Sequence, residues 1–294
     1  MESFTLGQIL GILGLPPQPG PATPITSVTT DSRAAGPGSL FIAIAGQRHD
    51  GHDFVASALR AGAEAAIVSR DVILPAGLTG RPLLKVPDTI AAYGRIAAWR
   101  RRQWAGPLIA LTGSNGKTTT REMLAHLLSP SYNLLRSPKS FNNNIGVPHT
   151  LLQLAPQHNL AIIELGASAP GEIAPLAAIA QPDLGLITNI GESHLEKLGS
   201  LEGVAAEKGA LLQALPPGGH AFLNADDPMT PLLASLRPNG PATTFGRSDS
   251  ADVRCVREER SPGGNRFWLA DGRECRLPVP GRHNISNALA ALAV

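Results

Sequence analysis

The chain has 294 residues, of which 43% are hydrophobic and 16% are charged, with 31 glycines and 26 prolines. This composition excludes a disordered chain and a fibre, and the length allows about two domains. The formal net charge is +2 and the basic residues are scattered, so we expect no nucleic-acid-binding stripe and no membrane-binding patch. Only five of the 25 basic residues are lysines, which makes each lysine a candidate for a specific role.

Cys255 and Cys275 are too few for a disulfide framework. Two free thiols in a reducing compartment are favoured over a pairing across neighbouring strands. The first 15 residues contain no basic leader and no run of 18 apolar residues, and they predict a short amphipathic helix. We therefore expect a soluble, cytoplasmic protein.

The proline-rich segment 16–24 predicts a loop after this opening helix. Short strands are expected within 39–46 and 65–69, with a helix at 52–63 between them. A longer helix runs from about Asp88 to Arg102. Together these elements predict a small α/β domain at residues 1–103.

After Pro107 the sequence changes to strand–loop–helix repeats. Apolar runs that end in polar residues lie at 108–113, 161–166, 184–190 and 220–225, and helical stretches lie between them. This alternation predicts a mostly parallel sheet with helices on both faces, in a second domain at 104–294. Ligands bind beyond the carboxyl ends of the strands in such sheets, so the residues that end these runs are site candidates.

The clearest motif is Thr112–Thr119, TGSNGKTT, between an apolar run and a helical stretch. Glycines allow a tight turn whose N–H groups point at phosphate oxygens, a lysine adds a cation, and a hydroxyl can ligate Mg²⁺. The loop is shorter than the usual P-loop, because Leu111 stands where glycine is common. An ordinary glycine-rich turn is the alternative, but the flanking strand and helix favour a nucleotide site. The expected contacts are Gly113, Ser114, Asn115, Gly116, Lys117, Thr118 and Thr119.

Three single residues are further candidates. Glu164 ends an apolar run and is either a Mg²⁺ ligand or a solvated strand end, and the phosphate loop favours the ligand. His194 follows the run 184–190, and this place favours a ligand over a purely structural histidine. Lys208 lies in a helical segment of small residues, where composition alone favours a surface lysine paired with an acid.

Two polar clusters have two interpretations each. Asn142, Asn143 and Asn144 form either a turn or a set of amide contacts to a polar ligand. In the first domain, Arg33 and Arg48 could hold a phosphorylated ligand, whereas Asp31 before Arg33 could cap a helix or form a turn.

Together these motifs resemble the Mur ligases, the ATP-dependent amino-acid ligases of bacterial peptidoglycan precursor synthesis. The phosphate loop, Glu164, His194 and Lys208 occur in the order and approximate spacing of that family. One series resembles the uridine-nucleotide domain of two members: Asp31-Ser32-Arg33, Phe41, Gly46, Asp50-Gly51-His52 and Phe54. Four segments resemble the member that adds the terminal dipeptide: 142–148, 164–167, 170–173 and 188–191.

The resemblance implies that ATP phosphorylates the carboxylate of UDP-N-acetylmuramoyl-tripeptide, and that the amine of D-alanyl-D-alanine then displaces phosphate. It assigns the loop with Lys117 to the ATP phosphates, and Asn142 and Asn143 to the substrate and phosphate side. Ser140 stands where asparagine is common, so that contact is not carried over. Asn287 matches the adenine side.

The resemblance also assigns the metal and the first substrate. Thr118 and Glu164 would hold one Mg²⁺ and His194 a second, and Lys208 matches a lysine that CO₂ carbamylates to support magnesium. The uridine end would contact Ser32, Arg33, Gly46, Asp50 and His52. We expect a monomer.

Three other functions are weighed against this one. A ligase for the third peptide residue is disfavoured, because its His-Thr-Thr-Pro-like stretch is replaced here by asparagines. A GTPase is disfavoured, because no guanine-reading Asn-Lys-x-Asp segment follows. A nucleotide- and UDP-sugar-binding module without catalysis is the third, because the family's C-terminal domain is not expected within these residues.

Overall fold

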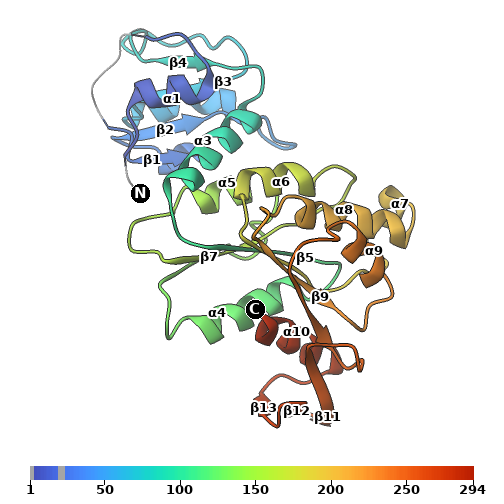
Figure 1. Ribbon diagram of the computed structural model, residues 1–294. Helices are drawn as coiled ribbons and strands as arrows, with labels where there is room; N and C mark the ends of the chain where they lie inside the picture. Colours follow the sequence, from blue (N-terminus) through green and yellow to red (C-terminus); the bar gives the residue numbers. More distant parts are fainter. Residues whose placement is uncertain (1–2, 19–23) are drawn as a thin grey trace. The chain divides into compact units, whose positions relative to one another are not determined.

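The structure is a computed structural model that describes residues 3–18 and 24–294. It divides into two compact units (Figure 1). Unit 1 comprises Met1–Trp104 and Leu151–Pro156, and unit 2 comprises Ala105–Thr150 and Gln157–Val294. The first two residues of the expected opening helix, and residues 19–23 of the expected loop, lie outside the described residues.

Unit 1 is built around a four-stranded parallel sheet in the order β1-β2-β3-β4. Strands β2 (Ser39–Ile42) and β3 (Ala65–Val68) are buried at every position, which explains why they are continuous apolar runs. The other elements are α1 (Leu6–Leu13), β1 (Ser27–Thr29), η1 (Ser32–Ala34), η2 (Gly51–Phe54), α2 (Val55–Arg60), β4 (Leu83–Lys85) and α3 (Thr89–Gln103).

The two long helices of unit 1 begin where the sequence supplies a capping residue. Thr5 and Gln8 form a capping box at the start of α1, and Gly14 ends that helix in the left-handed conformation. Asp88 accepts hydrogen bonds from Ile90 N and Ala91 N at the start of α3. The expected amphipathic opening helix and the helix from about Asp88 are confirmed.

Unit 2 contains a nine-stranded sheet in the order β13-β12-β11-β10-β9-β8-β5-β7-β6. Its strands are parallel from β6 to β11 across the sheet. Its elements are β5 (Leu108–Thr112), α4 (Lys117–Leu128), β6 (Leu134–Arg136), α5 (Gly146–Leu151), β7 (Leu160–Glu164), α6 (Ile173–Ala180), β8 (Leu184–Ile187), α7 (Leu195–Leu198), α8 (Leu201–Gln213), β9 (His220–Asn224), α9 (Thr230–Ser235), β10 (Ala242–Gly246), β11 (Val253–Ser261), β12 (Gly264–Leu269), β13 (Glu274–Leu277) and α10 (Arg282–Ala293).

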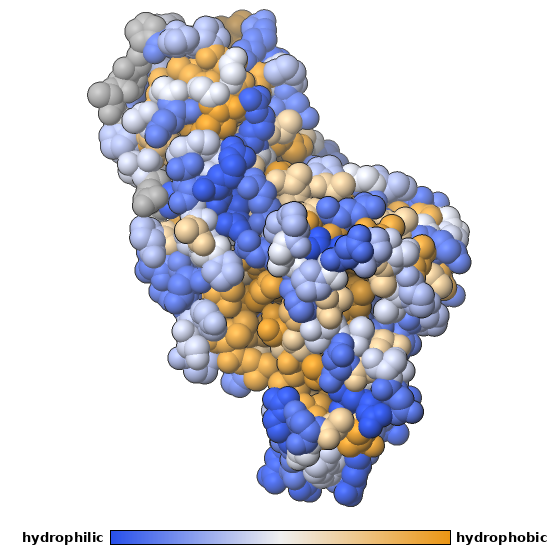
Figure 2. Space-filling model, in the orientation of Figure 1, coloured by the Kyte–Doolittle hydropathy of each residue, from blue (hydrophilic) through white to orange (hydrophobic). Residues whose placement is uncertain are grey.

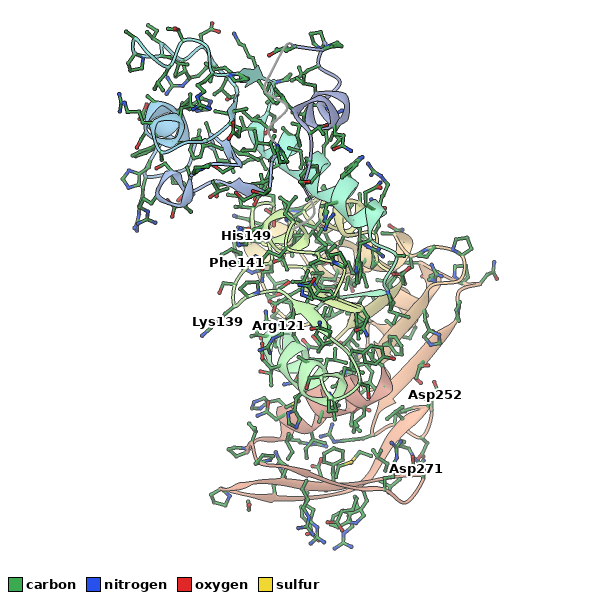
Figure 3. All side chains as sticks on the ribbon, turned by 90° about the vertical axis from the view of Figure 1, so that its left-hand side faces the viewer. Arg121, Lys139, Phe141, His149, Asp252 and Asp271 are labelled. Atoms are coloured by element: carbon green, nitrogen blue, oxygen red, sulfur yellow. The ribbon has the colours of Figure 1, made fainter. Side chains whose placement is uncertain are left out.

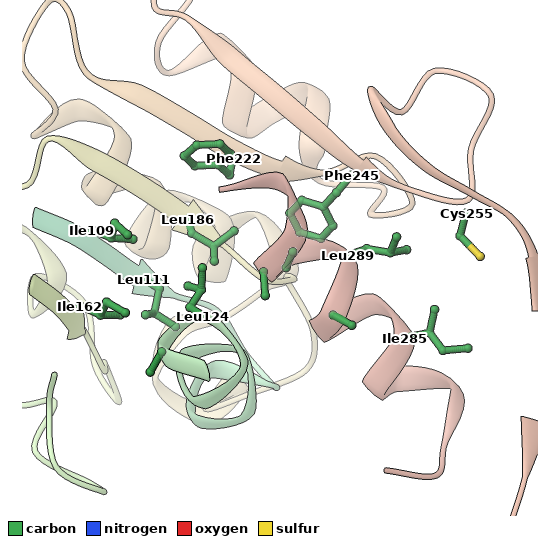
Figure 4. Close-up of a cluster of buried hydrophobic side chains, with 14 of the residues drawn as sticks. Ile109, Leu111, Leu124, Ile162, Leu186, Phe222, Phe245, Cys255, Ile285 and Leu289 are labelled. Carbon is green, nitrogen blue, oxygen red and sulfur yellow. The ribbon is translucent and has the colours of Figure 1, made fainter. Parts of the chain in front are cut away.

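Alternate strand residues point to opposite faces and build two cores. On β9, Phe222 packs with α4 and α10, whereas Leu223 packs with α8 and α9. Figure 4 shows the first of these cores, where Leu124 of α4 lies beside Leu186 of β8, and Leu289 of α10 lies beside Phe245 of β10. The expected α/β class, with a mostly parallel sheet and helices on both faces, is confirmed.

Strands β11, β12 and β13 add an antiparallel extension that the strand–helix pattern does not predict. Four consecutive charged residues, 257–260, lie on β11, and Figure 2 shows most of the visible surface of this extension as hydrophilic. Cys255 of β11 and Cys275 of β13 flank β12, and both thiols are free as expected. Strands two places apart are separated by about 9–10 Å, beyond the reach of a disulfide.

Candidate functional site

The glycine-rich loop joins β5 to the first turn of α4. Gly113 and Gly116 have φ angles of +149° and +80°, which favour glycine. A Cβ at Gly113 would lie 1.9 Å from Thr188 Oγ1, and one at Gly116 would lie 2.1 Å from Asn287 Oδ1. The glycines therefore allow β8 and α10 to approach the loop closely, and the first-turn N–H groups of α4 lack intrahelical acceptors.

Asn189, just after β8, binds the loop through its backbone and its side chain. Its carbonyl accepts from Ser114 N at 2.9 Å, its Oδ1 accepts from Asn115 N at 3.0 Å, and its Nδ2 donates to the Asn115 carbonyl at 3.0 Å. Thr188 Oγ1 donates to the same carbonyl at 2.7 Å. The amides of Ser114 and Asn115 are thus already bonded. Asn189 is missing from the expected site residues, and its signal was an asparagine at a strand's carboxyl end.

Lys117 is the cation of this loop. Its ammonium donates to the carbonyls of Gly113 at 2.7 Å and Ser114 at 3.3 Å. Burial lowers the pKa of Lys117, and the nearby Glu164 carboxylate opposes that shift. Carbonyl partners carry no net charge, so the ammonium keeps its positive charge for an anion in the cleft.

Glu164 ends β7 and is almost fully buried, with 2% of its surface exposed. One carboxylate oxygen accepts from Thr118 Oγ1 and from Arg121 Nη1, both at 3.1 Å, and the other accepts from Asn142 Nδ2 at 2.9 Å. The expectation of a solvated strand end is excluded by this burial. Thr118, Glu164 and Asn142, which are far apart in sequence, therefore lie together.

Arg121 is a site residue that the sequence analysis missed. It lies one helical turn after Lys117 on α4, and that spacing of two cations was the available signal. Its guanidinium also donates to the carbonyl of Pro138 at 3.2 Å. Figure 3 labels Arg121 beside the loop that carries Lys139 and Phe141.

Lys208 lies on α8 with only 1% of its surface exposed, so the surface-lysine alternative is wrong. Burial and the positive charge of Lys117 lower the pKa of Lys208 to about 8, although Glu207 acts in the opposite direction. Glu207, which the sequence analysis also missed, accepts from the backbone N–H groups of Gly171, Glu172 and Ile173 at 2.6–2.9 Å. It thereby caps α6, which has no side-chain cap of its own.

A polar cleft of about 530 Å³ lies at the Lys117 end of the glycine-rich loop. It is lined by Lys117, Asn142–Asn144, Gly166–Ser168, Gly171, Glu172, Pro175, Leu176, Ile179 and His194. His194 precedes α7 in the left-handed conformation with φ +55°. Asn143 forms the expected turn, because its Oδ1 accepts from Ile145 N and Gly146 N, while Asn142 contacts Glu164. The turn interpretation is therefore confirmed for Asn143, and amide contacts from this run to a polar ligand stay a prediction.

Two of the expected nucleotide contacts, Asn287 and Thr119, do not line the polar cleft. Asn287 is buried on α10, with Nδ2 donating to Asn284 Oδ1 at 3.2 Å and Oδ1 directed at Gly116. Thr119 lines a separate apolar cleft of about 570 Å³ between α4, α10 and β13, together with Met123 and Leu127. Of the two, only Asn287 is brought against the glycine-rich loop.

In unit 1, Asp31 caps η1, as one interpretation expected, and forms an ion pair with Arg33 at 2.7 Å. Hydrogen bonds from Arg33 lower the pKa of Asp31 to about 2. Ser32 lies within η1 beside this exposed pair.

The other expected unit 1 residues form a turn and a hydrogen-bonded network. Gly46 N donates to the His49 carbonyl at 2.9 Å. His52 is buried, with Nδ1 2.6 Å from Asp50 Oδ1 and with Nε2 accepting from Ser69 N at 2.9 Å. Both ring nitrogens of His52 are therefore used inside the protein, while Asp50 also contacts Arg70.

Comparisons with known proteins agree with this geometry. A model of the Mur ligase middle domain matches residues 111–294, and a model described as the Mur ligase family catalytic domain matches residues 24–101. UDP-N-acetylmuramoyl-tripeptide–D-alanyl-D-alanine ligase of Escherichia coli is 41% identical over all of this chain, which spans 65% of that relative's length.

Two solved structures share the fold. MurF from Acinetobacter baumannii matches all of this chain, with 64% of its own length covered, 35% identity and a TM-score of 0.90. MurF from Thermotoga maritima in complex with ADP matches 91% of this chain, with 62% of its own length covered, 27% identity and a TM-score of 0.83. Among the described residues, no helix combines the length and the apolar character needed to cross a membrane.

Proposed function

Because the chain belongs to the Mur ligase family, we propose that it takes part in the ATP-dependent addition of D-alanyl-D-alanine to UDP-N-acetylmuramoyl-tripeptide. One observation carries the proposal. The half-buried Lys117 and the buried Lys208 lie close enough for the charge of Lys117 to lower the pKa of Lys208, beside a polar cleft at the end of a glycine-rich loop. Buried cations that repel each other favour a site that takes anions.

Different residues of unit 2 have separate proposed roles in phosphoryl transfer. Lys117 and the first-turn N–H groups of α4 hold the ATP phosphates, and Asn287 beside Gly116 faces the adenosine. The tripeptide carboxylate attacks the γ-phosphorus of ATP, whose bond to the bridging oxygen breaks so that ADP leaves. The dipeptide amine then attacks the carbonyl carbon of the acyl phosphate, inorganic phosphate leaves, and the nitrogen loses a proton. Such transfers depend on alignment and charge neutralisation, which Lys117, Asn142 and His194 supply from the cleft wall.

The residues around Glu164 fit a magnesium ion. Mg²⁺ prefers oxygen ligands and is commonly held by one or two carboxylates plus substrate phosphates. Thr118 and Glu164 supply such oxygens, and His194 lines the same cleft. Among residues 3–18 and 24–294, this site included, no group of three or more His, Cys, Asp or Glu is placed to hold a metal, so the remaining ligands would come from the phosphates and water. When bound, Mg²⁺ would neutralise charge on the phosphates.

Lys208 is the proposed carbamate. CO₂ reacts only with a neutral amine, whose nitrogen bonds the CO₂ carbon and loses a proton. With a pKa of about 8, roughly one tenth of the Lys208 side chain is neutral at pH 7, far more than for an ordinary lysine. The carbamate would replace a repelled cation with an anion that supports the metal. Extra electron density on the Lys208 amine in bicarbonate would support this role, and an unmodified amine with magnesium bound would contradict it.

Unit 1 is proposed to bind the uridine end of the first substrate, near Ser32, Arg33, Gly46, Asp50 and His52. Arg33 has the exposed guanidinium that a diphosphate needs, whereas His52 contributes by holding Asp50 in place. All the proposed contacts come from one chain, so the proposal needs no second copy, and it places the protein in the cytoplasm with its nucleotide substrates.

The dependence of ADP release on the substrates supplied tests this function against its alternatives. The protein is incubated with Mg²⁺ and ATP, and ADP release is measured with two substrate pairs. Release that requires UDP-N-acetylmuramoyl-tripeptide and D-alanyl-D-alanine supports the proposal. Release with the UDP-linked dipeptide and diaminopimelate or lysine would instead favour the third-residue ligase. ATP binding without turnover by either pair, in protein extended to the length of its relatives, would favour a binding module.

A further inference from the structure

Two loops of unit 2 are joined by the hydroxyl of Ser114. Its Oγ donates to the Gly191 carbonyl at 3.0 Å, and it accepts from Gly191 N at 2.9 Å and from Ser193 Oγ at 3.0 Å. A serine hydroxyl has one proton to donate and two lone pairs. All three are used by the loop after β8, so the side chain has no capacity left for a phosphate oxygen.

The loop after β8 is anchored at its root by other groups. Thr188 and Asn189 bond to Asn115, and the backbone of Ile190 donates to an Asp227 carboxylate oxygen at 2.5 Å. Beyond Ile190, the segment 191–193 bonds to the phosphate loop through Ser114 Oγ. Removing this hydroxyl would therefore release residues 191–193 on the N-terminal side of His194, while the root of the loop and the His194 carbonyl, which accepts from Lys197 N and Leu198 N of α7, stay bonded.

The released segment would lead directly into His194, whose side chain would lose its support on that side. This residue lines the cleft together with Lys117 and Asn142, and its left-handed backbone is uncommon for a residue with a side chain. Such a conformation costs free energy and persists where neighbouring contacts hold it. The three bonds of Ser114 lie one to three residues before it.

We propose that Ser114 is a positioning residue that couples the phosphate loop to His194, so that nucleotide bound at the loop also orders residues 191–194. This inference rests on the proposed nucleotide binding. The coupling requires the hydroxyl itself, because the backbone of Ser114 bonds separately to Asn189. A threonine at position 114 keeps the hydroxyl and an alanine does not.

Hydrogen exchange with and without Mg·ADP tests the coupling, in the original protein and in the Ser114→Ala, Ser114→Thr and Ser235→Ala variants. Ser235 is a matched control, because its hydroxyl bonds within α9 to the Leu232 carbonyl. In the original protein, ADP is expected to slow exchange roughly tenfold in 116–119 and in 191–194. In Ser114→Ala the slowing persists at 116–119 and falls below about twofold at 191–194, and Ser114→Thr restores it.

Each outcome has a separate meaning. Equal protection of 191–194 in the original protein and Ser114→Ala, with 116–119 protected in both, would overturn the coupling and leave the proposed function intact. No protection of 116–119 in the original protein would overturn the proposed nucleotide site, and the coupling with it. In ligation assays, Ser114→Ala is expected to lower kcat at least tenfold while KM for ATP changes less than about threefold, because His194 and not the nucleotide is displaced.

Discussion

The candidate site residues of the two units differ in how their charges are neutralised. In unit 1, Asp31 pairs with Arg33, and Asp50 bonds to His52 and Arg70, so each charge meets an opposite or polar partner nearby. In unit 2, the ammonium of Lys117 meets only carbonyl oxygens, and Lys208 is buried beside a like charge. In unit 1 these charged side chains stabilise local turns of the chain. In unit 2 the positive charges of Lys117 and Lys208 would be stabilised by an anionic ligand.

The largest stability effect is expected at an ion pair of unit 2 in which both side chains are buried, Arg121 with Glu164. Glu164→Ala would remove the buried carboxylate partner of Arg121, since both side chains are 2% exposed, and leave the half-exposed Glu122 as the remaining carboxylate beside the guanidinium. Removing one member of such a pair costs about 3–5 kcal/mol. The calorimetric transition of unit 2 should therefore fall by several degrees.

Glu122→Ala is the matched control, because Glu122 also pairs with Arg121 but its side chain is 47% exposed. We expect a loss of less than about 1 kcal/mol there. Equal effects of the two substitutions would show that the burial of Glu164 does not govern the stability of the site.

The pH dependence of the free energy of unfolding tests whether Lys208 is a buried cation with a lowered pKa. Its pKa is lowered from 10.5 to about 8 in the folded chain. Below pH 8 both folded and unfolded lysines are protonated and the penalty is constant. Between about pH 8 and 10.5 the unfolded lysine keeps its proton while the folded one loses it, so stability rises with pH.

The rise should reach at most about 3 kcal/mol relative to Lys208→Met. Denaturant unfolding at a series of pH values measures it, in buffer free of CO₂ so that the amine stays unmodified. Parallel stability curves for the two proteins would contradict a depressed Lys208 pKa.

The smallest stability effect is expected in unit 1. The Arg33 side chain is 88% exposed, so Arg33→Ala should leave the unfolding midpoint unchanged. If Arg33 binds the diphosphate of the first substrate, affinity for that UDP-linked substrate should fall roughly tenfold in a calorimetric titration. Arg60→Ala, an exposed arginine at the end of α2, is the control and should not alter the affinity. An unchanged affinity in Arg33→Ala would remove Arg33 from the substrate site.

The parts of the molecule that depend on local sequence could be predicted. The strand–loop–helix order around Lys117, the amphipathic α1 and the helix from about Asp88 follow from the periodicity of apolar residues, and the structure confirms them. The family expected from the separated motifs is likewise confirmed.

What could not be predicted depends on contacts between segments far apart in the chain. Arg121 meets Glu164 across 43 positions, and Glu207 caps a helix that begins 34 positions earlier. Neither partner is marked in its own segment, because an arginine in a helix and a glutamate beside a lysine are common on solvated surfaces. The hydroxyl of Ser114 is similar, since its role appears only once the loop after β8 is placed beside it.

The central claim is that the loop at 113–118 binds nucleotide phosphates through Lys117. Calorimetric titration with ATP and Mg²⁺ of the original protein, Lys117→Ala and the exposed control Lys85→Ala tests it most directly. Losing a charge-assisted hydrogen bond costs about 1.5–3 kcal/mol, so Lys117→Ala should bind roughly 10- to 100-fold more weakly. Lys85→Ala should bind as the original protein does. Equal affinities in all three proteins would contradict the phosphate site.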